Sequence, residues 1–546
     1  MKRFHPYIIL SCLVVMTLSS CDDFLDEKPD NRMDLKTKED LKRLLVSAYP
    51  TNSPAYILEM RSDNTNEYHN TSWTSMGRMQ DQAYEWQDIT DVSSNDNPRN
   101  LWDACYTSVA TANEVIKFVD SKSADERAQY NEQIGEALLC RAYAMFVLAN
   151  TFCMAYDDAT ASKELGLPYP LEPETKVGVQ YERGTLAELY QKIDNDLQRG
   201  LPIVGNDYGT TPKFHFTQEA GYAFAARFYL YYRKYEEAKK YANLVLGAAP
   251  VTKLRNWAYM HTLSANGNVQ PLEFISTASP ANLLLNVYYS EWQYITGPWS
   301  YGNKYAHGER IARNETIKGT GPWGSSDEGD EQKDGMNYSV WSNSSLSRVF
   351  INKIPDLREV NQATNTYIPH TEIPVFTTDE TLMVRAEANV MLGNYDEALA
   401  DINTELTKFH SKGKQITLEN IKKYYNDATG VKYYTPQQPT ARKKFNTSFT
   451  IEPTTQEPML QCVLHLRRLL TLHEGLRMQD VKRYGIEVYR IRLNESQAVE
   501  AITDHFSAGD PRYAVQIPSD VVSAGMQPNP VVPLSITTAP TEYKKQ

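Results

Sequence analysis

The chain has 546 residues, of which 41% are hydrophobic and 23% charged, a composition that is ordinary for a soluble globular protein. Its formal net charge of −12 argues against a nucleic-acid partner, because a phosphate backbone calls for a basic stripe on the protein. The length allows several domains or one large helical domain.

The first segment is short and apolar. Lys2 and Arg3 precede an apolar run at residues 7–18. That run is shorter than the roughly 20 residues of a membrane-spanning helix and has the flanks of a secretory signal. It ends in Leu18-Ser19-Ser20-Cys21, so small residues lead directly to a cysteine. Such a thiol can take a diacylglycerol group, and several acyl chains anchor a protein stably. The pattern predicts a lipoprotein signal peptide at residues 1–20 and lipidation of Cys21, the alternative being an ordinary signal with an incidental cysteine.

Amphipathic helices dominate the next part of the chain. Residues 37–49 form the first predicted helix, because Leu41, Leu45 and Ala48 share one face. Residues 52–100 then lose helical periodicity and mix polar residues with aromatic ones. A stretch of this length is usually functional or disordered, and its aromatic residues argue against simple disorder. Further predicted helices lie at residues 101–119, 125–156 and 183–199.

A repeated helical unit is visible further along. Residues 219–252 fit the helix–turn–helix repeat of the tetratricopeptide kind, whose period is about 34 residues. Ala238 falls where the two helices must cross closely, and only a small side chain allows that approach. A second copy begins at Asp379, and residues 125–155 are a degenerate third candidate. Because the copies are scattered, we expect them to meet in space as a scaffold with other material inserted between them.

The inserted material at residues 251–374 is rich in Gly, Asn, Ser, Pro and aromatic residues and lacks helical periodicity. Short extended runs at residues 273–276 and 374–376 are predicted as small strands. Five of the eight tryptophans lie in this segment and two more in the earlier loop, while the predicted helices contain only Trp102. Tryptophans distributed by packing alone would favour the helical core. Their segregation therefore suggests a recognition surface.

The last part of the chain is heavily charged. Residues 416–425 are predicted as a short helix, 429–457 as an irregular stretch and 459–484 as the last long helix. The remaining residues are extended and broken by prolines. We expect an N-terminal helical region at residues 21–250 and a C-terminal region at residues 251–546, which together form one compact domain.

Sequence motifs for catalysis or metal binding are absent or weak in this chain. The chain has no HExxH, no phosphate-binding glycine loop and no GxSxG, so no catalytic residue is assigned and the protein is not expected to be an enzyme. His473-Glu474 is expected to belong to a structural ion-pair network. The acidic run Asp327, Glu328, Asp330 and Glu331, with Asp334, could chelate calcium, but it lacks EF-hand spacing and is expected to be a solvated loop. No cofactor is therefore predicted.

Four cysteines are left once Cys12 goes with the signal and Cys21 takes the lipid. Cys105, Cys140, Cys153 and Cys462 sit among apolar helical residues, and no CxxC occurs. Buried free thiols are the favoured interpretation, and a disulfide is the alternative.

Several segments together resemble the SusD/RagB-like family of nutrient-binding outer-membrane lipoproteins. The resemblance covers nearly the whole chain after the signal, and the order and spacing of its motifs are specific. The matching segments are Cys21 with residues 22–26, Leu101-Trp102 with Ala112-Asn113-Glu114, Arg141-Ala142-Tyr143, the helix at 378–388, the charged run at 474–485 and the tail at 517–530. Tyr484 departs from the family pattern, which has a tryptophan near the C-terminal helix motif.

The resemblance implies a mainly α fold. Tetratricopeptide-like helix pairs would form a right-handed scaffold that carries long irregular loops and a few short β-strands. It also implies a lipid-anchored location at the outer membrane, facing the cell exterior, and a role as a lid over a SusC-like, TonB-dependent transporter. In that family the helical repeats face the transporter and the aromatic loops face the ligand, which agrees with the segregation of tryptophans.

The expected function is to bind a nutrient, with a glycan or oligosaccharide as the favoured ligand. A flat aromatic ring stacks on the apolar face of a pyranose, and neighbouring polar side chains bind its hydroxyls. We expect the rings to converge in one outward recess, although each ring singly could instead anchor its loop to the scaffold. Alternative functions are a glycan-processing lipoprotein enzyme, a peptide binder and a structural adaptor. The candidate ligand-stacking residues are Trp73, Trp86, Trp292, Trp299, Trp323 and Trp341.

Overall fold

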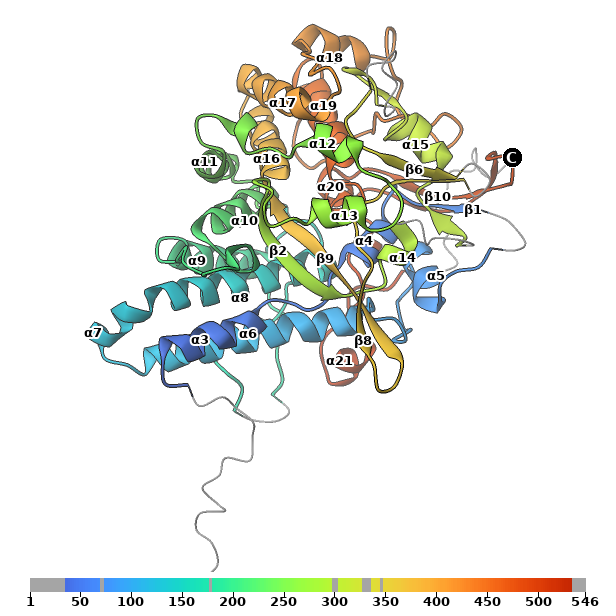
Figure 1. The fold of residues 1–546 in the computed structure, drawn as a ribbon. Coiled ribbons are helices and arrows are strands. Elements are labelled where there is room, and N and C mark those ends of the chain that lie inside the picture. The colour runs from blue at the N-terminus through green and yellow to red at the C-terminus, as the bar shows by residue number, and fades with distance from the viewer. Residues whose placement is uncertain are drawn as a thin grey trace, which may run out of the picture.

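The computed structural model describes residues 35–68, 73–175, 179–296, 303–326, 335–343 and 347–532. The predicted signal peptide, the lipidation site Cys21, Trp299 and the acidic run at 327–334 lie outside these residues. Within them helices dominate, as Figure 1 shows, so the prediction of a mainly α fold is confirmed. No helix in the described ranges is long and apolar enough to cross a membrane.

The N-terminal half is built on long helices whose ends are capped by their own sequence. Asn97 accepts a hydrogen bond from the Asn100 amide and starts α6, and Thr185 and Glu188 form a capping box that starts α9. Helix α8 is buried on nearly all sides because it packs against both α6 and α9. The long helices of this half are α3 (Lys38–Leu45), α6 (Pro98–Asp120), α8 (Asn131–Phe152) and α9 (Leu186–Gly200).

Two of the three predicted repeat units are helix pairs that meet in space, whereas residues 125–155 form mainly one long helix, α8. Helices α10 (Gln218–Tyr231) and α11 (Tyr235–Leu246) form the first pair, with Ala238 fully buried between them. Helices α16 (Thr378–Met391) and α17 (Tyr395–Phe409) form the second pair. Helix α11 packs on α16, so copies far apart in the sequence form one continuous helical stack, which runs along one side of the molecule in Figure 1.

The loop predicted at residues 52–100 contains more regular structure than its composition suggests. It holds two short helices and a strand, so the prediction of an irregular stretch is wrong over those residues. Short helices are set by tertiary packing more than by periodicity, which explains why the pattern missed them. The elements are α4 (Ala55–Arg61), β1 (Asn66–Tyr68) and α5 (Arg78–Tyr84).

The inserted segment likewise contains short elements. Residues 273–276, predicted as a strand, instead end a helix, whereas residues 374–376 do lie in a strand. The short helices of this segment and of the chain's remainder are α7 (Ala124–Arg127), α12 (Trp257–Thr262), α13 (Val269–Phe274), α14 (Gln293–Thr296), α15 (Glu309–Glu315), α18 (Leu418–Tyr424) and α21 (Ser519–Ser523).

Two small sheets and two hairpins complete the fold. One sheet has the order β11-β10-β1-β3, with β1 parallel to β10, and the other has the order β2-β9-β8 and is antiparallel. The remaining strands pair as β4-β5 and β6-β7. Their bounds are β2 (Asn282–Tyr289), β3 (Tyr305–Ala306), β4 (Thr320–Gly321), β5 (Gly324–Ser325), β6 (Val340–Asn343), β7 (Arg348–Ile351), β8 (Leu357–Asn361), β9 (Thr366–Thr377), β10 (Val488–Leu493) and β11 (Val499–Phe506).

The predicted long helix at residues 459–484 is two helices, α19 (Gln456–Leu470) and α20 (Arg477–Tyr484). The break occurs where His473 and Gly475 take positive φ angles of 72° and 75°. A Cβ atom at Gly475 would lie 2.6 Å from the Cα of Ala55, so only glycine allows this approach of α4. The chain turns here where α20 packs against α4.

The C-terminal part of the chain closes the end of α8. The Lys482 side chain donates to the carbonyl oxygens of Asn150 and Cys153, at 2.9 and 2.7 Å. The Val515 amide donates to the Thr151 carbonyl, and the Asn529 side chain donates to the Phe152 carbonyl. The last carbonyl groups of a helix have no partner within the helix, so these contacts satisfy them and fix the C-terminal segment to the N-terminal half.

The four cysteines Cys105, Cys140, Cys153 and Cys462 are buried and free, as the favoured interpretation predicted. Burial raises the pKa of each thiol, so they behave as small apolar side chains.

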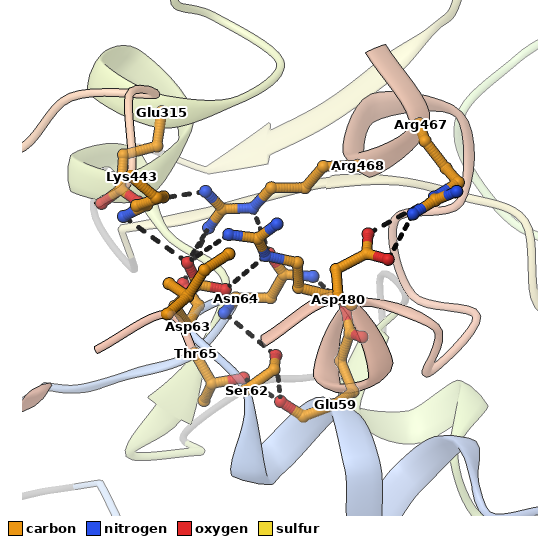
Figure 2. Close-up of polar contacts among 12 residues, drawn as sticks. Glu59, Ser62, Asp63, Asn64, Thr65, Glu315, Lys443, Arg467, Arg468 and Asp480 are labelled. Atoms are coloured by element: carbon orange, nitrogen blue, oxygen red, sulfur yellow. Dashed lines mark hydrogen bonds and ion pairs between the residues drawn. The ribbon is translucent and has the colours of Figure 1, made fainter. Parts of the chain in front are cut away.

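A buried charge network joins α4 and β1 to the C-terminal helices (Figure 2). Asp63, in the turn between α4 and β1, accepts two hydrogen bonds from Arg477 at 2.8 and 2.9 Å. Arg468 donates to the Asp63 carbonyl and pairs with Glu315 on α15, and Lys443 also pairs with Glu315 at 2.7 Å. We refer to Asp63, Glu315, Lys443, Arg468 and Arg477 as the Asp63 network. Burial alone would raise the pKa of Asp63, but Arg468, Arg477 and Lys443 hold it well below its usual value.

A second group of buried charges lies on the same helices. Arg467 pairs with Asp480 on α20 and with Glu387 on α16, and Tyr484 donates to Glu387 at 2.6 Å. Tyr484, the position that departs from the family pattern, is therefore a buried partner in this second group. Glu474 pairs with buried Lys353 at 2.9 Å, consistent with a structural role for the charged residues of this segment.

We predict that Asp63→Asn lowers the free energy of unfolding by about 3–5 kcal/mol, because it leaves three buried cations short of a counter-charge. The matched control is Asp427→Asn, which removes an exposed carboxylate that pairs with Arg442 and is expected to cost about 1 kcal/mol or less. Urea denaturation measures both. Equal losses in the two variants would contradict the role of the network.

A second prediction concerns pH. Glu372 on β9 lies opposite Val287 on β2, and burial raises the pKa of its carboxyl from 4.5 to about 7. The folded protein thus keeps a proton that the unfolded chain has released, so stability falls as pH rises from about 4.5 to about 7. We expect Glu372→Gln to reduce this fall, and Glu359→Gln, at an exposed position on β8, to leave it unchanged. Urea denaturation across this pH range would contradict the prediction if Glu372→Gln kept the wild-type slope.

Candidate functional site

The candidate site lies where β1, β3 and β7 meet. Asn66 on β1 pairs with Ala306 on β3, and Thr74 bridges to Asn303 just before β3. Gly308, just after β3, bridges to Arg348 on β7. Segments from the early loop and from the inserted segment therefore converge on one place.

Trp73 is held at this place by an aromatic side chain and a cation. Its ring lies 6.3 Å from the ring of Tyr68, and the guanidinium carbon of Arg348 lies 4.7 Å from its centroid. Trp73 is only half-buried, whereas Tyr68 and Arg348 are buried. Burial lowers the pKa of Arg348 to about 10, so the group is still charged at neutral pH. The result is a fixed, partly exposed indole, which is the kind of surface on which an apolar ligand face can stack.

The Asp63 network contacts the apolar cluster on which Trp73 packs. The buried members of this cluster are Tyr68, Ala306, Tyr489, Ile491 and Leu493, and Tyr434 packs against it as Trp73 does. The ammonium group of Lys443, a member of the network, lies 3.5 Å from the centroid of the Tyr434 ring. Arg310 donates to the carbonyl of Pro436 at 2.6 Å and so fixes the loop that carries Tyr434. The charges that hold α4 and β1 in place therefore also hold the cluster.

A second half-buried tryptophan lies on the neighbouring hairpin. Trp341 on β6 is opposite Phe350 on β7, and their rings are nearly parallel with centroids 4.7 Å apart. Phe350 and Arg348 are two residues apart on β7, so their side chains share one face of the strand. The β6–β7 hairpin thus carries both the partner of Trp73 and the partner of Trp341. We refer to the surface formed by Trp73 and Trp341 with these partners as the Trp73 surface.

Three of the other candidate tryptophans are interior anchors. Trp86, Trp292 and Trp323 are 3%, 1% and 0% exposed, so the expectation that their rings stack on a ligand is wrong in this structure. Each indole N–H has a partner: the carbonyls of Arg61 and His473, and the hydroxyl of Ser326. A buried indole with a satisfied N–H supplies a large apolar contact that a loop poor in regular structure needs. The expected recess of many tryptophans is therefore reduced to Trp73 and Trp341.

The residues that sequence reasoning missed are the partners of these rings: Tyr68, Arg348, Phe350 and Tyr434. The pattern Arg348-Val349-Phe350 is a strand-like alternation that could have indicated β7, but nothing in the sequence shows which tryptophan it meets. In the described ranges no group of three or more His, Cys, Asp or Glu side chains could hold a metal ion.

Gly308 allows the close approach that builds the site. A Cβ atom there would lie 1.8 Å from the Tyr68 hydroxyl and 2.3 Å from the Ser347 carbonyl. We predict that Gly308→Ala lowers the free energy of unfolding by about 1–3 kcal/mol and displaces Tyr68. The control Gly77→Ala meets nothing within 4 Å and should change stability by about 0.5 kcal/mol or less. Chemical denaturation tests this, and an unchanged Gly308→Ala variant would contradict it.

Comparison with known proteins gives one family match. Residues 23–230 match the SusD-like family described as starch-binding and associating with the outer membrane. The comparison with curated proteins gives no significant match.

Solved structures match along most of the chain. A putative sugar-binding protein from Bacteroides vulgatus is 19% identical, with 91% of this chain and 99% of that chain covered and a TM-score of 0.61. A SusD superfamily protein from Bacteroides vulgatus is 16% identical, with 91% and 100% covered and a TM-score of 0.63. A laminarin-binding SusD-like protein is 15% identical, with 91% and 100% covered and a TM-score of 0.54. The resemblance seen in the sequence is thus confirmed: residues 23–230 match the SusD-like family model, and the chain shares its fold with these solved structures.

Proposed function

We propose that this protein is a surface-exposed lipoprotein that binds a glycan and passes it to a SusC-like, TonB-dependent transporter. The observation that carries the proposal is the half-exposed indole of Trp73, held by Tyr68 and Arg348 on a SusD-type scaffold. The family description, which names starch binding and the outer membrane, and the laminarin-binding neighbour support a glycan as the ligand.

The proposed binding step is stacking without chemistry. A pyranose ring would lie on Trp73. Because Arg348 packs against the indole and already holds it in place, binding does not have to order the Trp73 side chain. Trp341 on the same hairpin offers a second ring for a longer oligosaccharide. Trp299 stays a candidate ligand contact.

A catalytic role is not proposed. His473 is buried and its amide donates to Glu59, and Glu474 is partly buried and paired to Lys353. Burial lowers the pKa of His473, which keeps the ring neutral. Incubation of the purified protein with glucans should release no reducing ends, and hydrolysis would support the enzyme alternative.

Anchoring is proposed to occur through acylation of Cys21. Intact-mass analysis of protein purified from membranes should find a lipidated N-terminal cysteine. A Cys21→Ser variant is then expected in the soluble fraction.

We predict that Trp73→Ala weakens oligosaccharide binding about tenfold or more, since loss of a central aromatic anchor typically costs more than 1 kcal/mol. Laminarin-derived and starch-derived oligosaccharides are the probes, and isothermal titration calorimetry is the measurement. Tyr259→Ala, at an exposed aromatic residue on α12, is the matched control and should bind as the wild type does. Wild-type affinity in Trp73→Ala would contradict the proposed site.

A further inference from the structure

A cavity whose lining shares no residue with the Trp73 surface lies between α5 and the C-terminal segment. Its volume is about 430 Å³, which is within the range of small-molecule sites. Arg61, Arg78 and Arg512 line it, together with the ring of Trp86 and the side chains of Gln87 and Asp88. Of these three arginines, Arg512 is paired with Asp504 and Asp510, and Asp88 is the one carboxylate in the lining itself.

Arg61, at the end of α4, is a buried cation with no counter-charge in contact. It is 2% exposed, and its side chain donates one hydrogen bond, from Nη2 to the carbonyl of Arg512 at 2.6 Å. Its Nε is buried and has no acceptor. Burial, followed by the charges of Arg490 and Arg512, lowers the pKa of Arg61 to about 9. In the part of the chain that the structure describes, Arg61 forms no ion pair. A buried charge without a partner is costly, so this group is unusual.

Two arginines near Arg61 already have partners of their own. Arg490 donates to the carbonyls of Met60 and Ser62 at the end of α4, and Arg512 pairs with Asp504 and Asp510. Arg78 and Asp88 are both exposed at the rim, and within the described residues neither forms an ion pair. Among the arginines that line the cavity, Arg61 and Arg78 are therefore the two whose guanidinium groups have no carboxylate partner within the described residues.

We propose that this cavity binds the oxyanion group of a small ligand, a carboxylate or a sulfate, with Arg61 at its floor and Arg78 at its rim. A guanidinium group presents a planar fork of N–H donors that matches such groups, and its interaction with an anion is stronger than a neutral hydrogen bond. The cavity is larger than one oxyanion, so a sugar ring that carries the charged group fits the remaining space beside Trp86. This site is separate from the Trp73 surface and does not depend on the function proposed there.

Calorimetry and thermal unfolding of the full mature chain test the proposal. The probes are sodium sulfate, glucuronate and glucose 6-sulfate, with glucose and sodium chloride at matched ionic strength as references. We expect at least one oxyanion probe to bind and to raise the melting temperature, while glucose and chloride do not. Binding of sulfate alone would identify a free anion as the ligand, and binding of the charged sugars alone would identify a sugar acid or sugar sulfate. Absence of binding by all three oxyanions would overturn the proposal.

Variants locate the binding. Arg61→Gln and Arg78→Glu are expected to weaken oxyanion binding tenfold or more, because hydrogen bonds to charged groups are the strong ones. Arg313→Gln, at an exposed arginine on α15, is the matched control and should bind as the wild type does. Arg78→Glu changes only an exposed side chain, so it keeps the test valid if Arg61→Gln fails to fold. Wild-type oxyanion affinity in Arg78→Glu or in folded Arg61→Gln would overturn the proposal, and neutral oligosaccharide binding at Trp73 should be unchanged in both.

Discussion

The buried charges around Asp63 are the constraint on which the arrangement of this protein depends. They connect the turn after α4 to α15, to the irregular segment at Lys443 and to α19 and α20, which lie far apart in the sequence. Each charge is costly to bury alone and acceptable only with its partners present. The network therefore fixes where β1 begins, and β1 ends in Tyr68, whose ring lies 6.3 Å from the ring of Trp73.

The helical stack and the loops are joined by a small number of specific contacts. Lys482, Val515 and Asn529 close the end of α8, so the last part of the chain is bound to the first. Trp86, Trp292 and Trp323 anchor the irregular segments by burying their rings and donating to fixed acceptors. Three of the candidate tryptophans are therefore used to hold the loops in place, whereas Trp73 and Trp341 are half-exposed.

Periodicity predicts the parts of this fold that are determined locally. The amphipathic helices and the two repeat pairs follow from their spacing, and the small residue at Ala238 correctly marks a close helix crossing. The direction in which a loop tryptophan points is not local, since it depends on partners such as Arg348 that come from other strands. The charges of residues 459–484 were visible, but their burial and the break at Gly475 depend on α4, about 400 residues earlier. The pairing of β1 with β10 is equally remote and has no signal in either segment alone.

The most direct test is a crystal structure of the protein with a bound oligosaccharide, chosen as the tightest binder in an affinity-gel screen of glucans. We expect a sugar ring to lie parallel to the Trp73 indole at van der Waals distance, about 4 Å, with Arg348 unmoved behind it. A well-ordered oligosaccharide bound elsewhere on the protein, with the Trp73 surface empty, would contradict the central claim.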